Sequence, residues 1–204
     1  FLGIKELTDN DKQKLLEYHN KFREVTTAGK APAPEGKRQP QAANMVELTW
    51  DEHAAKQAYK WASGCEFKHN TPTDKDGNPL GQNLAVKMST KKSNVDKTFD
   101  KWTKGLVKAW FNESNLYEFG GSINGQNGHY TQMVWANTTQ VGCGYSYFKI
   151  DQNNQKWYAG YLVCNYNPAG NIQDENPYIE GTVNCNHYGL QPASGKYHNL
   201  CKKK

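Results

Sequence analysis

The sequence predicts an α+β fold in which helices cover both faces of an antiparallel sheet. Apolar residues recur at helical spacings in several of the segments that precede Ser114. Three strand-like runs follow at residues 130–135, 142–150 and 157–166, and a polar turn at 151–154 joins the last two. A chain that begins with helices and ends with consecutive antiparallel strands is typical of a domain whose helices pack on a sheet.

The first two helices each begin with a capping box. The first runs from Thr8 to Gly29, with Thr8 as the cap and Asp11 at the position that reaches back to it. The second opens at a Thr-Trp-Asp-Glu box at 49–52 and continues to about Ser63. Both are expected to bury one apolar stripe.

The third helix is expected from about Asn94 to Ser114. Its apolar residues recur at steps of three and four, as Val95, Phe99, Trp102, Leu106 and Trp110. Continuing the stripe by three residues reaches Glu113. A carboxylate at that position either turns to solvent as the helix frays or faces a polar site, and the pattern leaves both open.

Length and charge limit the function classes. The 204 residues most simply form one domain, and no apolar run approaches the roughly 18 residues that a membrane span needs. The net charge is +5, and Lys97, Lys101, Lys104 and Lys108 share one helix face. We expect a solvated face here and no nucleic-acid site. The Lys202–Lys204 tail could add a weak, screened attraction to an anionic membrane surface.

Cysteines and sequons favour an oxidising, extracellular setting. None of the five cysteines forms a Cys-x-x-Cys pair, so a zinc-thiolate site is not expected. Asn112 and Asn137 each begin a glycosylation sequon.

Disulfide pairing is only partly predictable. Cys143 and Cys164 lie on the two hairpin-linked runs, so we expect a bridge between them. Cys185 and Cys201 could pair with each other and leave Cys65 free, or one of them could pair with Cys65.

Four segments resemble signatures of the CAP superfamily, which includes cysteine-rich secretory proteins, venom antigen 5 and plant pathogenesis-related class 1 proteins. They are the long runs Gly128–Thr138 and Tyr161–Asn171, the first-helix motif His19–Arg23, and Gly81–Leu84. Secreted venom-allergen-like proteins of invertebrates are the most similar kind. The resemblance implies a three-layer α-β-α sandwich over residues 1–171, followed by an irregular C-terminal extension over residues 172–204.

The resemblance also implies a central cleft lined by two histidines and two acidic residues. His69, His129 and Glu113 match three of these positions, and Gln82 stands at the fourth in place of an acid. Two imidazoles and a carboxylate could hold zinc or another divalent cation. Because Gln82 carries no charge, we expect weak binding that is lost below about pH 6. Taken alone, either histidine could equally be a satisfied polar residue at the edge of a core.

Lipid binding is the function that the resemblance favours, with sterols or fatty acids as ligands. The expected sterol loop carries the apolar residues Leu116, Tyr117, Phe119 and Ile123. The expected fatty-acid groove lies between the first and third helices, with walls at Phe22, Val25, Trp102 and Leu106. From composition alone, the loop could equally be an ordinary one anchored by two aromatic residues.

The sequence leaves two alternative functions. A metal-dependent hydrolase would need an activated nucleophile or a metal-bound water with a base. The chain has no Gly-x-Ser-x-Gly or His-Glu-x-x-His motif, and only Glu113 is left as a carboxylate base, so we do not expect an enzyme. Recognition of a host or immune protein is the other alternative, and no residue identifies such a partner.

Overall fold

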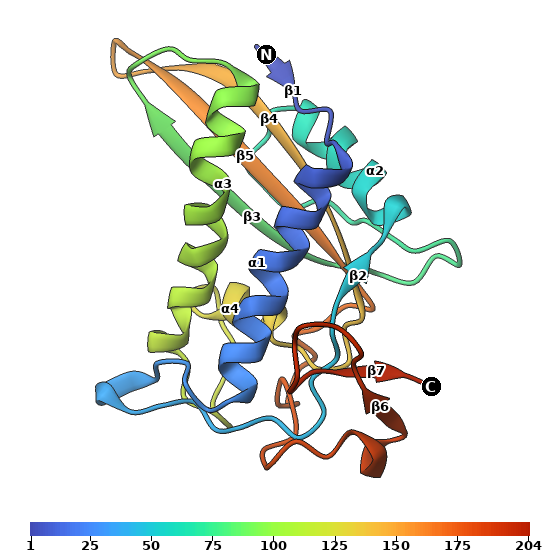
Figure 1. Ribbon diagram of the computed structural model, residues 1–204. Coiled ribbons are helices and arrows are strands. Elements are labelled where there is room, and N and C mark those ends of the chain that lie inside the picture. Colours follow the sequence, from blue (N-terminus) through green and yellow to red (C-terminus); the bar gives the residue numbers. More distant parts are fainter.

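A computed structural model describes residues 1–204 as three layers, with one sheet between two layers of helices (Figure 1). Four strands run in the order β1-β4-β5-β3, and β2 pairs with β4 at one end. The strands are β1 (Gly3–Ile4), β2 (Thr49–Trp50), β3 (Gly81–Ser89), β4 (Gln140–Gln152) and β5 (Gln155–Asn167). The helices are α1 (Asp9–Thr27), α2 (Glu52–Ser63), α3 (Val95–Asn112) and α4 (Gly128–Met133), with short 3-10 turns at Pro34–Gly36, Glu113–Leu116 and Cys185–Tyr188. The expected sandwich is confirmed.

Side-chain alternation along the strands divides the core into two parts. The face of β5 that carries Leu162, Cys164 and Tyr166 packs in a cluster of 23 buried residues with α1, α3 and α4. The opposite face, with Tyr161 and Val163, packs in a cluster of 7 buried residues with α2. Small side chains on α2 and two glycines on β4 let this helix lie close to the sheet. A Cβ atom at Gly144 would come within 2.5 Å of the backbone nitrogen of Tyr59.

The hairpin of β4 and β5 forms as predicted. The two strands pair in antiparallel register from Gln140↔Asn167 to Gln152↔Gln155. Cys143 lies directly opposite Cys164, and the expected disulfide joins them.

The capping box predicted for α1 is confirmed, and the one predicted for α2 is wrong. The side chain of Thr8 accepts a hydrogen bond from the Asp11 amide, and the Asp11 carboxylate accepts one from the Thr8 amide. In α2 the cap is Asp51, which accepts from the Ala54 amide. Thr49 lies two residues before this cap, in the strand β2, where it pairs with Gln140.

The strand expected at 130–135 is also wrong, because Gly128–Met133 is the helix α4. The Glu113 carboxylate accepts hydrogen bonds from the amides of His129 and Tyr130, at 3.0 and 3.4 Å. It thus satisfies two amides of the first helical turn that have no partner within the helix. Tyr130 and Met133 are fully buried in the larger core, so packing also holds the helix.

Arg23 joins α1 to the chain that follows α4. Its guanidinium is fully buried and has no carboxylate partner. It donates instead to five backbone carbonyl oxygens, those of Val46, Met133, Trp135, Ala136 and Thr138, at 2.8–3.5 Å. Burial lowers the pKa of Arg23 to about 9, and the ring of carbonyl oxygens stabilises its charged form at neutral pH.

The C-terminal segment 172–204 packs against the domain. Its strands β6 (Leu190–Pro192) and β7 (Cys201–Lys203) form a small sheet, and a disulfide joins Cys185 to Cys201. Cys201 also exchanges backbone hydrogen bonds with the segment before β2. Cys65 remains a free thiol, which resolves the pairing that the sequence leaves open. None of the helices has the length and apolar character that crossing a membrane requires.

Candidate functional site

His129 and Glu113 form the more buried half of the expected site. Glu113 ends α3 as its C-cap residue, and His129 lies in the first turn of α4. His129 Nδ1 lies 2.7 Å from Glu113 Oε2. An ionised carboxylate only accepts hydrogen bonds, so Nδ1 carries the proton. The Nε2 atom is then the nitrogen with the free lone pair, and no hydrogen bond within the protein occupies it.

Trp110 fixes the plane of the His129 ring. The two rings stack with their centroids 5.9 Å apart and an angle of 22° between their planes. Trp110 is itself held by a 3.0 Å hydrogen bond from its indole nitrogen to the Leu84 carbonyl oxygen on β3. The His129 ring is therefore restrained both in plane and in tautomer.

His69 and Gln82 form the other half, and His69 is exposed to solvent. His69 Nδ1 lies 2.8 Å from Gln82 Oε1. The backbone amide of Asn70 donates to the same atom of Gln82, at 3.3 Å. A backbone amide can only donate, which supports oxygen as the atom of Gln82 that faces His69. His69 Nδ1 then carries the proton, and its Nε2 is free to bind a ligand.

The Gln82 amide group is oriented from α2. Asn165 donates through Nδ2 to the Ala54 carbonyl oxygen at 3.2 Å, which leaves its Oδ1 atom facing Gln82. Gln82 Nε2 donates to this oxygen at 2.9 Å and to Asn70 Oδ1 at 2.7 Å. The register of β3 on β5 places Gln82 directly opposite Asn165. A backbone carbonyl of α2 thus fixes the His69 tautomer through two side-chain amides.

Both halves are bonded to β3, His69 through Gln82 and His129 through the next residue, Asn83. Asn83 donates through Nδ2 to the His129 carbonyl oxygen at 3.1 Å. We call the set His69, Gln82, Glu113 and His129 the histidine site. Sequence reasoning named all four, but it missed Asn70, Asn83 and Asn165, which orient them. Asn83 and Asn165 lie inside the matched signatures, which was the available signal.

A third histidine, His19, takes no part in the site. It is fully buried, with Nδ1 bonded to the Leu15 carbonyl oxygen at 2.8 Å and Nε2 to the Tyr166 hydroxyl at 2.7 Å. Both ring nitrogens are satisfied in the neutral form, and burial lowers the pKa of His19 to about 4. His19 is therefore a structural residue of the core.

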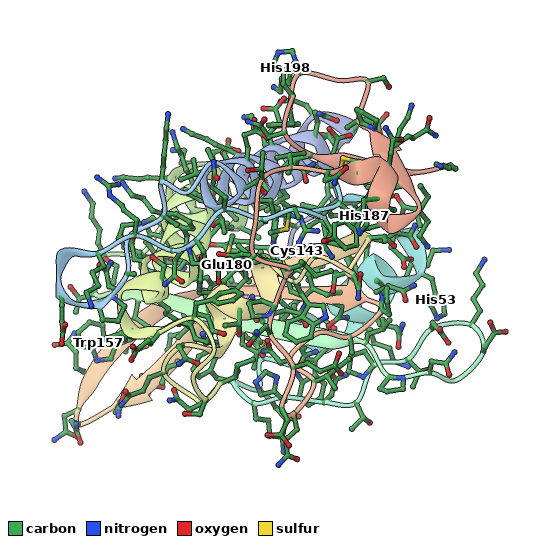
Figure 2. All side chains as sticks on the ribbon, turned by 90° about the horizontal axis from the view of Figure 1, so that it is seen from below. His53, Cys143, Trp157, Glu180, His187 and His198 are labelled. Carbon is green, nitrogen blue, oxygen red and sulfur yellow. A yellow bond between two sulfur atoms is a disulfide. The ribbon has the colours of Figure 1, made fainter.

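The expected three-ligand metal set is not gathered as such. No group of three or more His, Cys, Asp or Glu side chains lies close enough to hold a metal ion. The remaining histidines, His53, His187 and His198, lie at three separate places (Figure 2). Glu113 uses both oxygens on His129 and Tyr130, so it orients one imidazole where a third ligand was expected. The nitrogen donors that remain are Nε2 of His69 and Nε2 of His129.

The expected sterol loop is partly anchored in the core. Tyr117 is buried, and Phe119 packs on Tyr178 with ring centroids 4.9 Å apart. Leu116 is 58% exposed. Ile123 lines a pocket of about 530 Å³ together with Ile172, the Gly120–Ser122 segment and polar residues of 171–176. Two of the four apolar residues are thus available to a ligand, and the two aromatic ones serve as anchors.

Of the four residues expected to line a fatty-acid groove, Leu106 lies in the larger core, Phe22 and Val25 pack against it, and Trp102 lies outside it. Phe22 stacks on Phe111, with ring centroids 4.2 Å apart. Trp102 packs instead near Tyr147 of the sheet and beneath the Lys87 ammonium. Val25 and Leu106 pack in the larger core.

Comparison with known proteins decides the family. The model of the CAP family, described as the cysteine-rich secretory protein family, matches residues 16–166. The chain belongs to this family. It is 60% identical to salivary antigen-5 of Triatoma infestans, over the whole chain and 86% of that protein. It is 40% identical to venom allergen 5 of Vespula vidua, over 84% of the chain and 81% of that protein.

One solved structure of the same fold is named as a complex with a metal ion. It is NaASP2 with Zn²⁺, which is 28% identical with a TM-score of 0.70, covering 98% of this chain and 100% of that one. The curated relatives are named as salivary and venom antigens or allergens, and not as enzymes, in accord with the expectation of a non-enzymatic protein. Saliva and venom are secreted fluids, in accord with the expected extracellular setting.

Proposed function

We propose that this CAP protein is a secreted binding protein whose histidine site takes a divalent cation through Nε2 of His69 and Nε2 of His129. One observation carries the proposal: each imidazole is held in the Nδ1-protonated tautomer by a hydrogen bond to an acceptor, at 2.7 and 2.8 Å. A metal-binding histidine characteristically donates its other nitrogen in this way, which fixes the ring and raises its basicity.

The donor set favours some ions over others. Imidazole nitrogen is a good ligand for both Cu²⁺ and Zn²⁺. Across the first-row divalent metals, the affinity of a given site generally rises from Mn²⁺ to Cu²⁺ and is lower again for Zn²⁺. We therefore expect Cu²⁺ to bind more tightly than Zn²⁺. With two protein ligands and a neutral Gln82, the site is weaker than a closed three- or four-ligand site, and water would complete the coordination. The Zn²⁺ named with the NaASP2 structure supports zinc as one of the ions bound.

Isothermal titration of EDTA-stripped protein with Zn²⁺ and Cu²⁺ tests the proposal. The double variant His69→Ala, His129→Ala should lose the saturable binding of one ion per chain. The matched control is His187→Ala, His198→Ala, because both of these histidines are exposed and lie outside the site. Unchanged affinity in the first variant, or an equal loss in the control, would rule out the histidine site.

Lipid binding is a second proposal, supported by the exposed apolar residues around the 530 Å³ pocket. Leu116 precedes the loop that lines this pocket, and Ile172 on its far wall is 47% exposed. Ligand pockets of drug-sized molecules fall in the range of about 300–1,000 Å³. Most of the lining is polar, so we expect a ligand with both an apolar body and a polar end, as a sterol or a fatty acid has.

Native mass spectrometry with added cholesterol or palmitate tests the lipid proposal. We expect saturable adducts, reduced by Leu116→Asn with Ile172→Asn. Met88→Gln is the control, because Met88 is 41% exposed on a distant strand end. If neither a lipid nor a cation binds, recognition of a host protein is the interpretation that gains.

Secretion and glycosylation remain part of the proposal. The side chains of Asn112 and Asn137 are both exposed, so a glycan at either would displace no core residue. A shift in mass after treatment with a peptide N-glycosidase, on protein from a eukaryotic secretory host, would demonstrate occupancy.

A further inference from the structure

A further pocket lies where the C-terminal segment meets the chain that follows α4. Its volume is about 490 Å³, and none of the four residues of the histidine site lines it. Asn44, Phe119 and residues 135–137 form part of its lining, and residues 175–180 form the rest. We call it the asparagine pocket. One of its lining residues, Asn137, is exposed and begins a glycosylation sequon, so a glycan at Asn137 would start at the rim of this pocket.

Two nearly buried side chains of the asparagine pocket hold unused hydrogen-bond donors. Trp135 is 3% exposed, and Asn44 is 7% exposed. Asn44 Oδ1 accepts from the Ile179 amide at 3.0 Å, which leaves its Nδ2 group as a free donor. Neither this group nor the indole nitrogen of Trp135 has a hydrogen-bond partner in the protein, and neither is sealed from solvent. Both are available to an acceptor that enters the pocket.

The rest of the lining offers acceptors and an apolar surface. The carboxylates of Glu175 and Glu180 are exposed and form no ion pair. Phe119 packs on Tyr178 and contributes an aromatic ring to the lining. An N-acetylated sugar complements this combination, because it has a carbonyl acceptor, several hydroxyl donors and a methyl group.

We propose that the first N-acetylglucosamine of a glycan at Asn137 occupies the asparagine pocket. The oxygens of the sugar accept from Trp135 and Asn44, its hydroxyl groups donate to the two glutamates, and its methyl group packs beside Phe119. The inference rests on the glycosylation included in the proposed function, and it needs neither the metal nor the lipid. A tether makes the binding intramolecular, with an effective concentration of order millimolar, so a weak sugar contact suffices.

A sugar in this pocket would tie the C-terminal segment to the domain. The segment is held here by backbone hydrogen bonds, from the Ala136 amide to the Pro177 carbonyl oxygen at 2.8 Å and from the Gly181 amide to the Gln41 carbonyl oxygen at 3.0 Å. Amides of such contacts exchange with solvent when the segment opens locally. Contacts between the sugar and both sides of the pocket would make this opening rarer.

The test compares the wild type with Asn137→Gln, both secreted by a host that makes only high-mannose glycans. Endoglycosidase H then leaves a single N-acetylglucosamine on each occupied asparagine, so bulk effects of the outer glycan are removed. Hydrogen exchange of the Ala136, Ile179 and Gly181 amides should be at least about threefold slower in the trimmed wild type, since one net hydrogen bond is worth about 1 kcal/mol. The matched control is Asn112→Gln, which removes the other sequon at the end of α3 and should exchange like the wild type.

The donor role of Trp135 has its own measurement. The ¹H–¹⁵N signal of its indole group should shift between the trimmed wild type and Asn137→Gln, which needs no change in the pocket itself. In Trp135→Phe, exchange of the same amides should no longer depend on whether the sugar is present. Because each background is compared with and without the sugar, any loss of stability from the substitution cancels. Trp157→Phe is the control, since Trp157 lies well apart from Glu180 of the pocket (Figure 2).

Three outcomes would overturn the proposal. They are equal exchange in the trimmed wild type and Asn137→Gln, an equal effect of Asn112→Gln, and an indole signal of Trp135 that ignores the sugar. Each of these leaves the proposed glycosylation standing, because mass spectrometry of the same samples reports whether Asn137 carries a sugar. An unmodified Asn137 in the secreted protein would overturn both the docking and the glycosylation at this residue.

Discussion

His129 donates through Nδ1 to Glu113 Oε2 at 2.7 Å, across a gap of 16 residues in the sequence. The same carboxylate accepts the backbone amide of His129, at 3.0 Å. One side chain at the end of α3 therefore starts the helix α4 and also determines which nitrogen of its histidine can bind a ligand. Folding and binding are coupled through Glu113.

Glu113→Gln should weaken cation binding at least tenfold while preserving the fold. The amide oxygen can still accept from the His129 backbone, but the amide nitrogen then faces Nδ1 and favours the other tautomer. That tautomer protonates Nε2 and removes its lone pair. Loss of an outer-shell partner typically costs 10–100-fold in metal affinity. Titration calorimetry gives the affinity, and ¹⁵N chemical shifts of the imidazole report the tautomer. Unchanged shifts with unchanged affinity would contradict this role for Glu113.

Gln82→Glu should strengthen cation binding and weaken the fold. The added negative charge attracts the cation and makes His69 more basic, so we expect a roughly tenfold gain in affinity. The cost arises because Gln82 Nε2 donates to Asn165 and Asn70, and a carboxylate cannot donate. Leaving the buried Asn165 oxygen without its donor should cost about 1–3 kcal/mol of unfolding free energy. Urea denaturation without metal measures this cost, and a variant as stable as the wild type would show that the amide chain does not orient His69.

His19 should make the fold less stable as the pH falls from about 6.5 to about 4. Its folded-state pKa is lowered to about 4 by burial, whereas an unfolded histidine titrates near 6.5. In this window the unfolded chain binds a proton that the folded one does not, so the free energy of unfolding decreases with decreasing pH. From pH 7 to pH 5 the contribution is about 2 kcal/mol. The measurement is urea denaturation at both pH values with EDTA present. His19→Gln should show a smaller difference between pH 7 and pH 5, and an identical difference would refute the assignment.

Arg23→Lys should destabilise the protein by about 3 kcal/mol or more, although the charge is retained. An ammonium group cannot reproduce the fork of the guanidinium, so several of the five carbonyl oxygens would lose their donor. Arg38→Lys is the control, since Arg38 is exposed and bonds only the Lys30 carbonyl oxygen. Its effect should stay within about 0.5 kcal/mol. Equal midpoints of urea unfolding for the two variants would contradict the role of Arg23.

Features that depend on neighbouring residues could be predicted from the sequence. The capping box at Thr8 and Asp11 needs only a spacing of three residues, and it forms. The β4–β5 hairpin and its disulfide follow from two apolar runs joined by a short turn. The helix α4 could not be predicted in this way, because 130–135 has the composition of a strand. Its conformation is fixed from outside by Glu113 and by packing in the core.

The same division holds for the site. The four residues of the histidine site could be named because they lie in segments that resemble the family signatures. Their hydrogen bonds could not be predicted, because the Asn165–Gln82 contact depends on the register of two strands that lie about 80 residues apart in the chain. That register makes Gln82, which was expected only to line the cleft, an oriented partner of the His69 imidazole.

Anomalous diffraction from a crystal soaked in Zn²⁺ tests the central claim most directly. The account predicts one ion at about 2.0–2.1 Å from Nε2 of both His69 and His129, with Glu113 still bonded to His129 Nδ1. An ion bound by the Glu113 carboxylate with that hydrogen bond broken, or an ion held by other residues of the chain, would contradict it.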